Sequence, residues 1–399
     1  MSGEGPRPAA DSRAVPEHTA PEAATLAESR PVAGPGAEPE TAASAAPAGP
    51  RPIPWLDAIA PYVMGKPPAR EQPRGAKLSS NENPFGPSPL GIAAAVAALT
   101  TVNRYPDDQS ALRARIAAFQ GVGPENVIAG AGSDEIIHLV CAVYLEPGRR
   151  LVLGSPPYGI HRIAGQLSGA ELVRVPLADW THDLPSMAAA ARSGDVIAVT
   201  NPHNPTGTTV RPDDLRAFLA TVPRDCVVLV DEAYHEFMDE DARVSAIGML
   251  DRHPGLIVSR TFSKVYGLAG LRAGYGIGNP ATLEPLDRVR TPANVNSVAM
   301  AAALAALDDT GHVERTVALT IEGRRRLEET CVRLGLDHVP SQTNFVLVAD
   351  RDGWPEALGR DGISVRPGAN LGVPGWHRVT IGTPAEMDRL IAVLELLFG

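Results

Sequence analysis

Between residues 126 and 277 the chain alternates between short apolar runs and stretches with the spacing of helices, and this alternation limits the folds open to it. Strands that alternate with helical patterns are typical of βαβ units. The sequence therefore predicts an α/β fold with a mostly parallel, seven-stranded sheet. The strand candidates are 126–129, 151–153, 171–175, 195–200, 226–230, 256–259 and 274–277, with helices at 135–144 and 212–220 between some of them.

The segments outside this region predict the domain organisation. Residues 1–50 are mostly Ala, Pro, Gly and Glu, without any aromatic residue, so they cannot bury enough apolar surface to fold. We predict a disordered extension there, either inert or used for docking. Residues 51–87 are expected to form an N-terminal arm and part of a small domain, 88–295 the large domain, and 296–399 the C-terminal small α+β domain. Further helices are predicted at 54–62, 91–99, 111–119, 296–334 and 384–398.

The composition argues against several classes of function. The net charge of −10 disfavours a nucleic-acid partner and a membrane surface. The three cysteines have no C-x-x-C spacing, so we expect neither a disulfide framework nor a metal site. No apolar run approaches the roughly 18 residues of a membrane span, and we expect no secretory signal in residues 1–50, because they lack an apolar h-region. A soluble cytoplasmic protein is the expectation.

One stretch, residues 261–272 (TFSKVYGLAGLR), carries the most informative chemistry. It follows the apolar run 255–259, which places Lys264 where a buried strand ends. Burial disfavours the charged form of an amine, and a neutral lysine amine forms a Schiff base with a carbonyl group. Ser263 adds a hydroxyl group and Arg272 a fixed positive charge. Together they suit a ligand with an aldehyde and a phosphate, such as pyridoxal phosphate (PLP).

Two motifs after predicted strands have an ordinary and a functional interpretation. Residues 130–135 (GAGSDE) either bind a phosphate at a helix start or form a plain N-cap. Tyr158, in 155–159 (SPPYG), either lies against a cofactor ring or is packed in a turn. In 200–207 (TNPHNPTG), prolines hold Asn204 rigidly at the binding edge of the sheet.

Acidic and basic residues at strand ends extend this pattern. Asp231 ends the apolar run 226–230, where a carboxylate is costly without a partner. A protonated pyridine nitrogen is a suitable partner, and Tyr234 could bond the ring oxygen; the alternative is a capping Asp. Arg366 and Arg378 lie in strand-like segments, either to grip a carboxylate or phosphate or simply at the surface.

Taken together, these motifs resemble those of the class I/II aminotransferases of PLP fold type I, and most closely the histidinol-phosphate aminotransferases. The resemblance covers about residues 52–399 in the order of the family. The segments that carry it are 77–84 (KLSSNENP), 104–107 (RYPD), 132–135 (GSDE), 204–207 (NPTG), 231–234 (DEAY), 261–272, 340–347 (PSQTNFVL) and 378–383 (RVTIGT).

The resemblance implies a role for each matching residue. Lys264 would hold PLP and move a proton, and with Asp231 and Tyr234 it makes the expected catalytic set. The implied cofactor-binding residues are Lys264, Asp231, Asn204, Tyr234, Tyr158, Gly132, Ser133, Asp134, Thr261, Ser263 and Arg272. The implied substrate-binding residues are Arg378, Arg366, Tyr62, Asn83 and Tyr105. Tyr105 would reach over from the partner subunit of a homodimer with shared active sites.

The activity that the resemblance implies is a ping-pong transfer of the amino group between histidinol phosphate and 2-oxoglutarate/glutamate, in histidine biosynthesis. An aromatic (phenylalanine-type) or other amino-acid aminotransferase is an alternative on the same fold, as is a PLP-dependent decarboxylase or oxidase. A transaminase-like regulator would need a DNA-binding domain, and residues 1–50 are too short and too polar for one. His203 and the extension depart from the family pattern.

Overall fold

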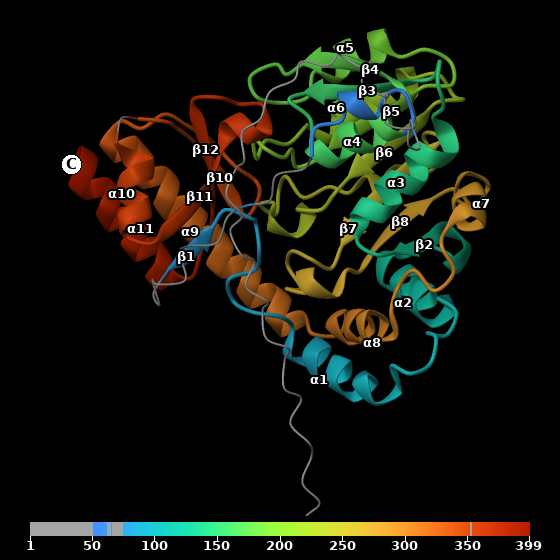
Figure 1. Ribbon diagram of the computed structural model, residues 1–399, viewed down its shortest axis with the longest axis horizontal. Coiled ribbons are helices and arrows are strands. Elements are labelled where there is room, and N and C mark those ends of the chain that lie inside the picture. The colour runs from blue at the N-terminus through green and yellow to red at the C-terminus, as the bar shows by residue number, and fades with distance from the viewer. Residues whose placement is uncertain (1–50, 62–64, 66–74, 352) are drawn as a thin grey trace, which may run out of the picture. The chain divides into compact units, whose positions relative to one another are not determined.

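The structure is a computed structural model that describes residues 51–61, 65, 75–351 and 353–399. The predicted extension and Tyr62 lie outside these residues. Pro52–Gly399 form one compact unit, which contains two sheets (Figure 1). None of the helices in the described part of the chain combines the length and apolarity that crossing a bilayer requires.

The larger sheet confirms the predicted α/β fold with a mostly parallel, seven-stranded sheet. Its strand order is β2-β8-β7-β6-β5-β3-β4, and β8 alone in this sheet runs against its neighbours. Each strand overlaps one of the seven predicted strands. The bounds are β2 (Val127–Gly130), β3 (Arg150–Ser155), β4 (Glu171–Pro176), β5 (Val196–Thr200), β6 (Val227–Asp231), β7 (Leu256–Thr261) and β8 (Gly274–Gly278).

The central strands are buried on both faces. In β6, Val228 and Val230 enter one hydrophobic core, whereas Val227 and Leu229 enter another on the opposite face. Successive side chains of a strand point to opposite faces, so a strand covered on both sides must be apolar at every position. This explains why the sequence shows continuous apolar runs here rather than strict alternation.

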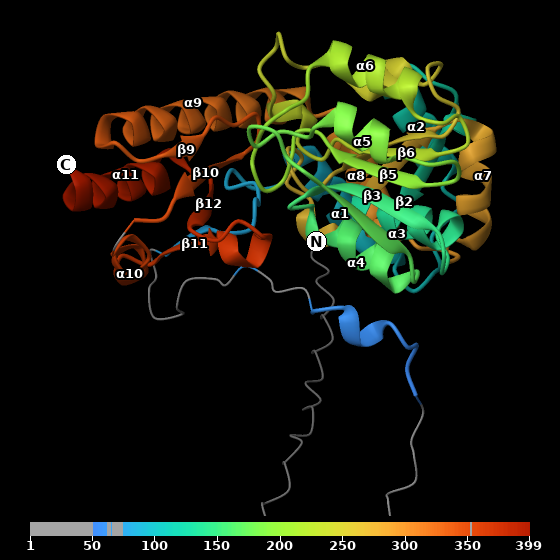
Figure 2. The same ribbon diagram turned by 90° about the horizontal axis from the view of Figure 1, so that it is seen from above.

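Helices cover both faces of this sheet (Figure 2). Apolar residues of α3 (Ser133–Tyr144), α4 (Gly159–Leu167) and α7 (Pro280–Val289) belong to the core on one face. The opposite core takes residues from α1 (Pro89–Ala98), α2 (Ser110–Gln120), α5 (Leu184–Ala190), α6 (Pro212–Thr221) and α8 (Ser297–Ala306). The sheet is therefore the middle layer of three.

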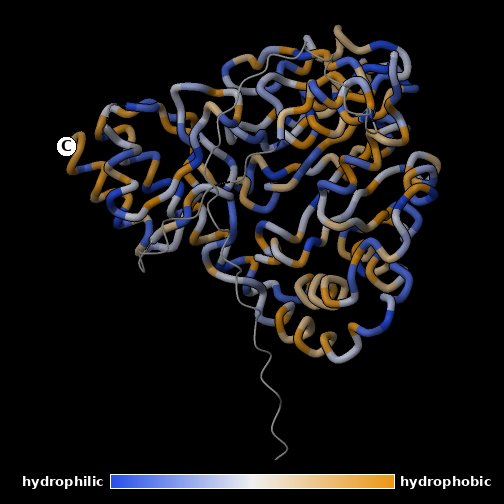
Figure 3. Tube along the Cα trace, in the orientation of Figure 1, coloured by the Kyte–Doolittle hydropathy of each residue, from blue (hydrophilic) through white to orange (hydrophobic). Residues whose placement is uncertain are grey.

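Two predicted helices are wrong in extent. The predicted helix at 296–334 is two helices, α8 and α9 (Thr310–Leu334), because Asp309 between them caps α9 through the His312 amide and accepts a hydrogen bond from Ser88. Apolar residues occupy most of α8, which is buried against α1 (Figure 3). Of the predicted helix at 54–62, the described residues form only the 3₁₀ turn η1 (Leu56–Ala58).

The smaller sheet has five strands in the order β1-β11-β12-β10-β9. Its bounds are β1 (Ala76–Leu78), β9 (His338–Val339), β10 (Phe345–Ala349), β11 (Ile363–Pro367) and β12 (Trp376–Thr380). Residues of α9, α10 (Trp354–Arg360) and α11 (Pro384–Phe398) share its core. Pairing of β1 with β11 joins the N-terminal part of this unit to its C-terminal part (Figure 1). The domain boundaries at 87/88 and 295/296 stay a prediction.

The strand directions bring the functional loops together. Strands β2, β3, β5, β6 and β7 run the same way, so the loops that follow them lie at one edge of the sheet. These loops begin at 131, 156, 201, 232 and 262, where the sequence places its motifs. Ligands bind at this edge in open α/β sheets.

Close contact between β8 and the start of α3 gives the first prediction. A Cβ at Gly274 would lie 2.4 Å from the backbone nitrogen of Ser133, so alanine must displace the helix start. We expect Gly274→Ala to lower the free energy of unfolding by about 1 to 3 kcal/mol in urea titrations. Gly248→Ala is the matched control, because among the described residues no atom lies within 4 Å of its Cβ position. Equal stability of the two variants would contradict this packing.

Candidate active site

A cavity of about 410 Å³ lies at the C-terminal edge of the large sheet, beside the loop that follows β1. Its walls include most of the residues that the sequence singled out. These are Ser133, Asp134, Tyr158, Asn204, Asp231, Tyr234, Thr261, Ser263, Lys264, Arg272, Arg366 and Arg378. The fold thus brings residues from distant parts of the chain to one place.

Asp231 ends β6 with its carboxyl group buried. The Ser259 hydroxyl donates to Oδ1 at 3.0 Å, and Nε2 of His161 lies 3.9 Å from Oδ2. Burial raises the pKa of Asp231 to about 7. His161 brings no compensating charge, because burial lowers its pKa to about 3. The carboxyl group is therefore prepared to face a cation that arrives with a ligand.

The Tyr234 hydroxyl accepts hydrogen bonds from two amide groups. Nδ2 of Asn81 donates at 2.8 Å and Nδ2 of Asn204 at 3.3 Å. Phe345 meets the Tyr234 ring edge to face, at 5.3 Å between centres. The phenol is thereby fixed in the cavity wall, where it can donate to an oxygen of a ligand.

Lys264 lies just after β7, as the sequence predicts. Its Nζ donates to the backbone oxygen of Asn81 at 3.3 Å and lies 5.5 Å from the centre of the Tyr234 ring. These contacts are to neutral groups. The amine, Tyr234 and Asp231 line the same cavity, so an electrophile bound there can meet the amine and the carboxyl group together.

The start of α3 and the segment after Lys264 form one end of the cavity. Gly132 has φ of +85°, and a Cβ there would lie 2.5 Å from Nη2 of Arg272. Arg272 donates to Asp134 Oδ2 at 3.1 Å and to Ser263 Oγ at 3.4 Å. Tyr158 donates to the other Asp134 oxygen at 3.1 Å. Backbone N–H groups of a helix start, a hydroxyl group and a guanidinium group together suit a phosphate.

Arg366 and Arg378 lie opposite each other on β11 and β12, and both are buried. Arg378 donates to Asn204 Oδ1 at 2.7 Å and to the Ser79 oxygen at 3.2 Å. Its guanidinium group lies 5.2 Å from the centre of the Phe345 ring. Both guanidinium groups line the cavity, and their positive charge there favours an anionic group of a ligand.

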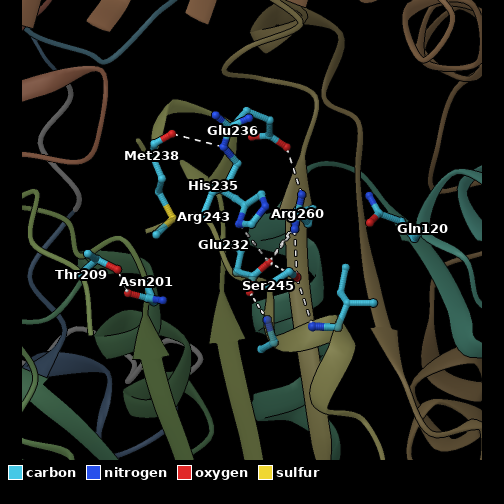
Figure 4. Close-up of polar contacts among 12 residues, drawn as sticks. Gln120, Asn201, Thr209, Glu232, His235, Glu236, Met238, Arg243, Ser245 and Arg260 are labelled. Carbon is cyan, nitrogen blue, oxygen red and sulfur yellow. Dashed lines mark hydrogen bonds and ion pairs between the residues drawn. The ribbon is translucent and has the colours of Figure 1, made fainter. Parts of the chain in front are cut away.

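Next to Asp231, a network of buried ion pairs joins Arg260 to Glu232 and Glu236 (Figure 4). Arg260 on β7 donates to Glu232 Oε2 at 2.7 and 3.0 Å and to Glu236 Oε1 at 3.2 Å. Ser245 Oγ also donates to Glu232, at 2.8 Å. Glu232 follows Asp231 directly, so this network ties the end of β6 to β7, the strand that leads to Lys264.

Some predicted residues lie elsewhere. Asn83 is outside the cavity lining; its amide donates to the Val265 oxygen at 2.9 Å, and its Oδ1 accepts from Phe85. Tyr105 is 92% exposed and does not line this cavity, and Gly132 contributes through its backbone position. Tyr62 lies outside the described residues. The roles expected for these residues stay predictions.

Sequence reasoning missed Asn81 and His161. Asn81 has φ of +54° and is buried. Besides its contacts with Tyr234 and Lys264, its Oδ1 accepts a hydrogen bond from the Thr380 hydroxyl at 3.0 Å. The loop motif 77–84 contains both Asn81 and Asn83, and the sequence does not indicate which of the two asparagines lies in the site. His161 lies one helical turn after Tyr158, without a motif. Among the described residues, no group of three His, Cys, Asp or Glu side chains is placed to hold a metal.

The raised pKa of Asp231 predicts a pH dependence of stability for the protein purified without cofactor. Because the folded state keeps a proton that the unfolded chain has lost, stability falls as the pH rises from the unfolded pKa through the folded one. Relative to Asp231→Asn, wild type should lose about 2 kcal/mol of unfolding free energy between about pH 5 and about pH 7. Urea titrations at both pH values measure it, with exposed Asp214→Asn as the control. If the unfolding free energies of wild type and Asp231→Asn changed by the same amount between the two pH values, the raised pKa of Asp231 would be contradicted.

Comparison with known proteins agrees with the geometry. Residues 74–394 match the family model for aminotransferase class I and II. A histidinol-phosphate aminotransferase of Symbiobacterium thermophilum is 46% identical over 349 residues, which are 85% of this chain and 96% of that protein. Histidinol-phosphate aminotransferase 2 of Ralstonia nicotianae is 44% identical over 356 residues, 86% of this chain and 95% of that protein.

A solved structure is also similar. The crystal structure of histidinol-phosphate aminotransferase from Sinorhizobium meliloti, in complex with pyridoxal-5'-phosphate, has a TM-score of 0.77 and 29% sequence identity. The match covers 88% of this chain and 99% of that one. With a family model that matches most of the chain and relatives above 40% identity, the chain belongs to the aminotransferase class I and II family.

Proposed function

We propose that the protein is a PLP-dependent transaminase that moves the amino group of histidinol phosphate to 2-oxoglutarate, a step of histidine biosynthesis. The observation that carries this is the convergence of Lys264, Asp231 and Tyr234 in one cavity with the buried arginines Arg366 and Arg378. The named relatives support the substrate, since they are histidinol-phosphate aminotransferases and the matches cover 96% and 95% of their lengths. A cytoplasmic location is part of the proposal.

The residues present fit PLP. The buried Asp231 carboxyl, with its raised pKa and a neutral histidine beside it, is suited to a protonated pyridine nitrogen. The other implied contacts are Asn204 and Tyr234 at the ring oxygen, Tyr158 against the ring, and Gly132, Ser133, Asp134, Thr261, Ser263 and Arg272 around the phosphate. Lys264 would hold the group covalently. When bound, PLP supplies an electron sink for the bond at the substrate carbon.

The chain's own residues would do the rest. Once the incoming amine has displaced it from the cofactor, Lys264 would move the proton between the substrate carbon and the cofactor, because its amine reaches into the cavity beside Tyr234. Arg378 and Arg366 bind the anionic end of each substrate in turn. The amides of Asn81 and Asn204 hold the Tyr234 hydroxyl in place during both halves of the reaction.

A second copy of the chain is proposed to complete the site through Tyr105 and to cover an apolar surface. Large apolar side chains are exposed on α1 and in the turns after it, in a stretch that ends just before Tyr105; they are Leu90, Ile92, Val96, Leu99 and Val102. Soluble monomers seldom expose so many in one place. A self-complementary surface of this kind suits a two-fold homodimer.

The lysine assignment is tested with glutamate release from histidinol phosphate and 2-oxoglutarate, and with the visible absorption of bound PLP. Lys264→Ala should lose that absorption band and at least about a thousandfold in kcat, since both the covalent link and the proton carrier are gone. Lys77→Ala is the control, because Lys77 lines the same cavity but is paired with Glu82 at 2.8 Å. Undiminished turnover by Lys264→Ala would refute the mechanism.

Shared active sites are tested by mixing two weak variants. A hybrid of Lys264→Ala and Tyr105→Ala subunits has one site with both native residues. After subunit exchange of equal amounts, activity should therefore rise to about a quarter of wild type. The mixture would show only the mean of the two separate activities if each chain used its own Tyr105. Sedimentation of each variant checks that the dimer is intact.

A further inference from the structure

A second cavity, of about 540 Å³, adjoins the first and shares Tyr158, Asn204, Arg366 and Arg378 with it. Its other walls come from α4, β4, the segment 155–157, Pro205, the 3₁₀ turn η7 (Gly368–Leu371) with Gly372 after it, and residues 60–61. A Cβ at Gly372 would lie 2.9 Å from Cβ of Pro156, so η7 and the segment 155–157 are in close contact on one side. A substrate held by the shared arginines therefore borders directly on this second space.

The second cavity is cationic. Four arginines line it: Arg162 on α4, Arg174 on β4, and the inner pair Arg366 and Arg378. No Asp or Glu is among the described residues that line it. The chain as a whole carries a net charge of −10, so this local excess has the opposite sign. A cleft lined by charge of one sign attracts and concentrates oppositely charged ligands.

Arg162 is oriented by a neutral partner. Its Nη1 donates to Oε1 of Gln166, one helical turn later, at 2.6 Å. The same Gln166 side chain donates through Nε2 to the Ala58 oxygen at 3.0 Å, and is thereby held in place. A glutamate at this position would neutralise the guanidinium group, whereas glutamine orients it and leaves its charge available.

Arg174 lies on β4, the edge strand of the large sheet, and is exposed. In the described part of the chain, neither Arg174 nor Arg162 has a carboxylate within ion-pair distance. Exposure therefore decreases from Arg174 through the half-buried Arg162 to the buried inner pair. This order suits a path along which an anion is progressively desolvated.

We propose that Arg162 and Arg174 form an outer anion subsite that binds a phosphate group and makes the enzyme select phosphorylated amines. This assignment rests on the proposed function and adds two specificity residues to it. Guanidinium groups match the tetrahedral oxygens of a phosphate dianion, and four of them around one cavity exceed what a single carboxylate needs. The subsite is separate from the phosphate end at Ser133 and Arg272, which lie in the first cavity only.

Inorganic phosphate is the direct probe, titrated into the PLP-loaded protein by calorimetry. Arg162→Gln and Arg174→Gln should each weaken its Kd roughly three- to tenfold, with the smaller effect at the exposed Arg174. Arg174→Lys should keep most of the affinity, because it keeps the charge. Arg211→Gln is the matched control, an exposed arginine that removes the same charge away from this cavity. An unchanged Kd in the double variant Arg162→Gln/Arg174→Gln would overturn the proposal.

Gln166→Glu tests the charge while Arg162 stays in place. The new carboxylate pairs with Arg162, so phosphate affinity should fall about as far as in Arg162→Gln. In urea titrations, Gln166→Glu should be at least as stable as Arg162→Gln. A loss of phosphate affinity in Gln166→Glu would then come from the neutralised charge of Arg162 and not from a loss of structure. Phosphate affinity equal to wild type in Gln166→Glu would show that the charge of Arg162 is not used.

Kinetics connect the subsite with selectivity. In the double variant, the KM for histidinol phosphate should rise by a larger factor than the KM for histidinol. This rise in KM should also exceed the fall in kcat for histidinol phosphate. An equal rise for both amines would count against the subsite. If wild type did not turn over histidinol phosphate, the proposed function would fail, and the phosphate titration would still decide whether Arg162 and Arg174 bind a phosphate.

Discussion

The buried carboxyl group of Asp231 is the constraint on which the arrangement of the site depends. It stands at the end of β6, whose four preceding residues are all apolar, and a charge without a partner is unfavourable there. Ser259 provides one hydrogen bond, and the neighbouring His161 stays neutral. Without a ligand the carboxyl group avoids this cost by keeping its proton, since burial raises the pKa of Asp231 to about 7; a cation bound in the cavity would offset the cost of the charged form. The position of this carboxyl group at the edge of the central sheet therefore favours a ligand with a positively charged ring.

Charges next to this position follow a different rule. Glu232 is as buried as Asp231, but Arg260 and Ser245 satisfy its oxygens within the chain (Figure 4). A compensated pair of this kind holds two strands in register and has no need of a ligand. Adjacent acids of one sequence motif therefore differ in their surroundings: Glu232 is paired within the chain, whereas Asp231 lines the cavity. The hydrogen-bond partners, rather than burial, distinguish them.

The parts that sequence predicts well are those with a local cause. Continuous apolar runs identify the central strands, and a polar residue directly after such a run, as at Asp231 or Lys264, lies at the ligand-binding edge because parallel strands share it. Contacts between distant segments were not predictable. The pairing of β1 with β11 brings Asn81 into the site, and only that pairing separates its role from that of Asn83. Likewise, Asp309 interrupts a helical pattern because Ser88, far away in sequence, bonds to it.

A transaminase that works in two half-reactions must accept two different anionic substrates in one cavity. The inner arginines Arg366 and Arg378 can serve both, because a carboxylate and a phosphate each take two hydrogen bonds from a guanidinium group. Discrimination must then come from groups that only one substrate reaches. Arg162 and Arg174 have the right place for this, since they line the adjoining cavity and not the first one. Specificity between two ligands is a difference of affinities, and charge placed beyond the shared contacts creates that difference without altering the chemistry at Lys264.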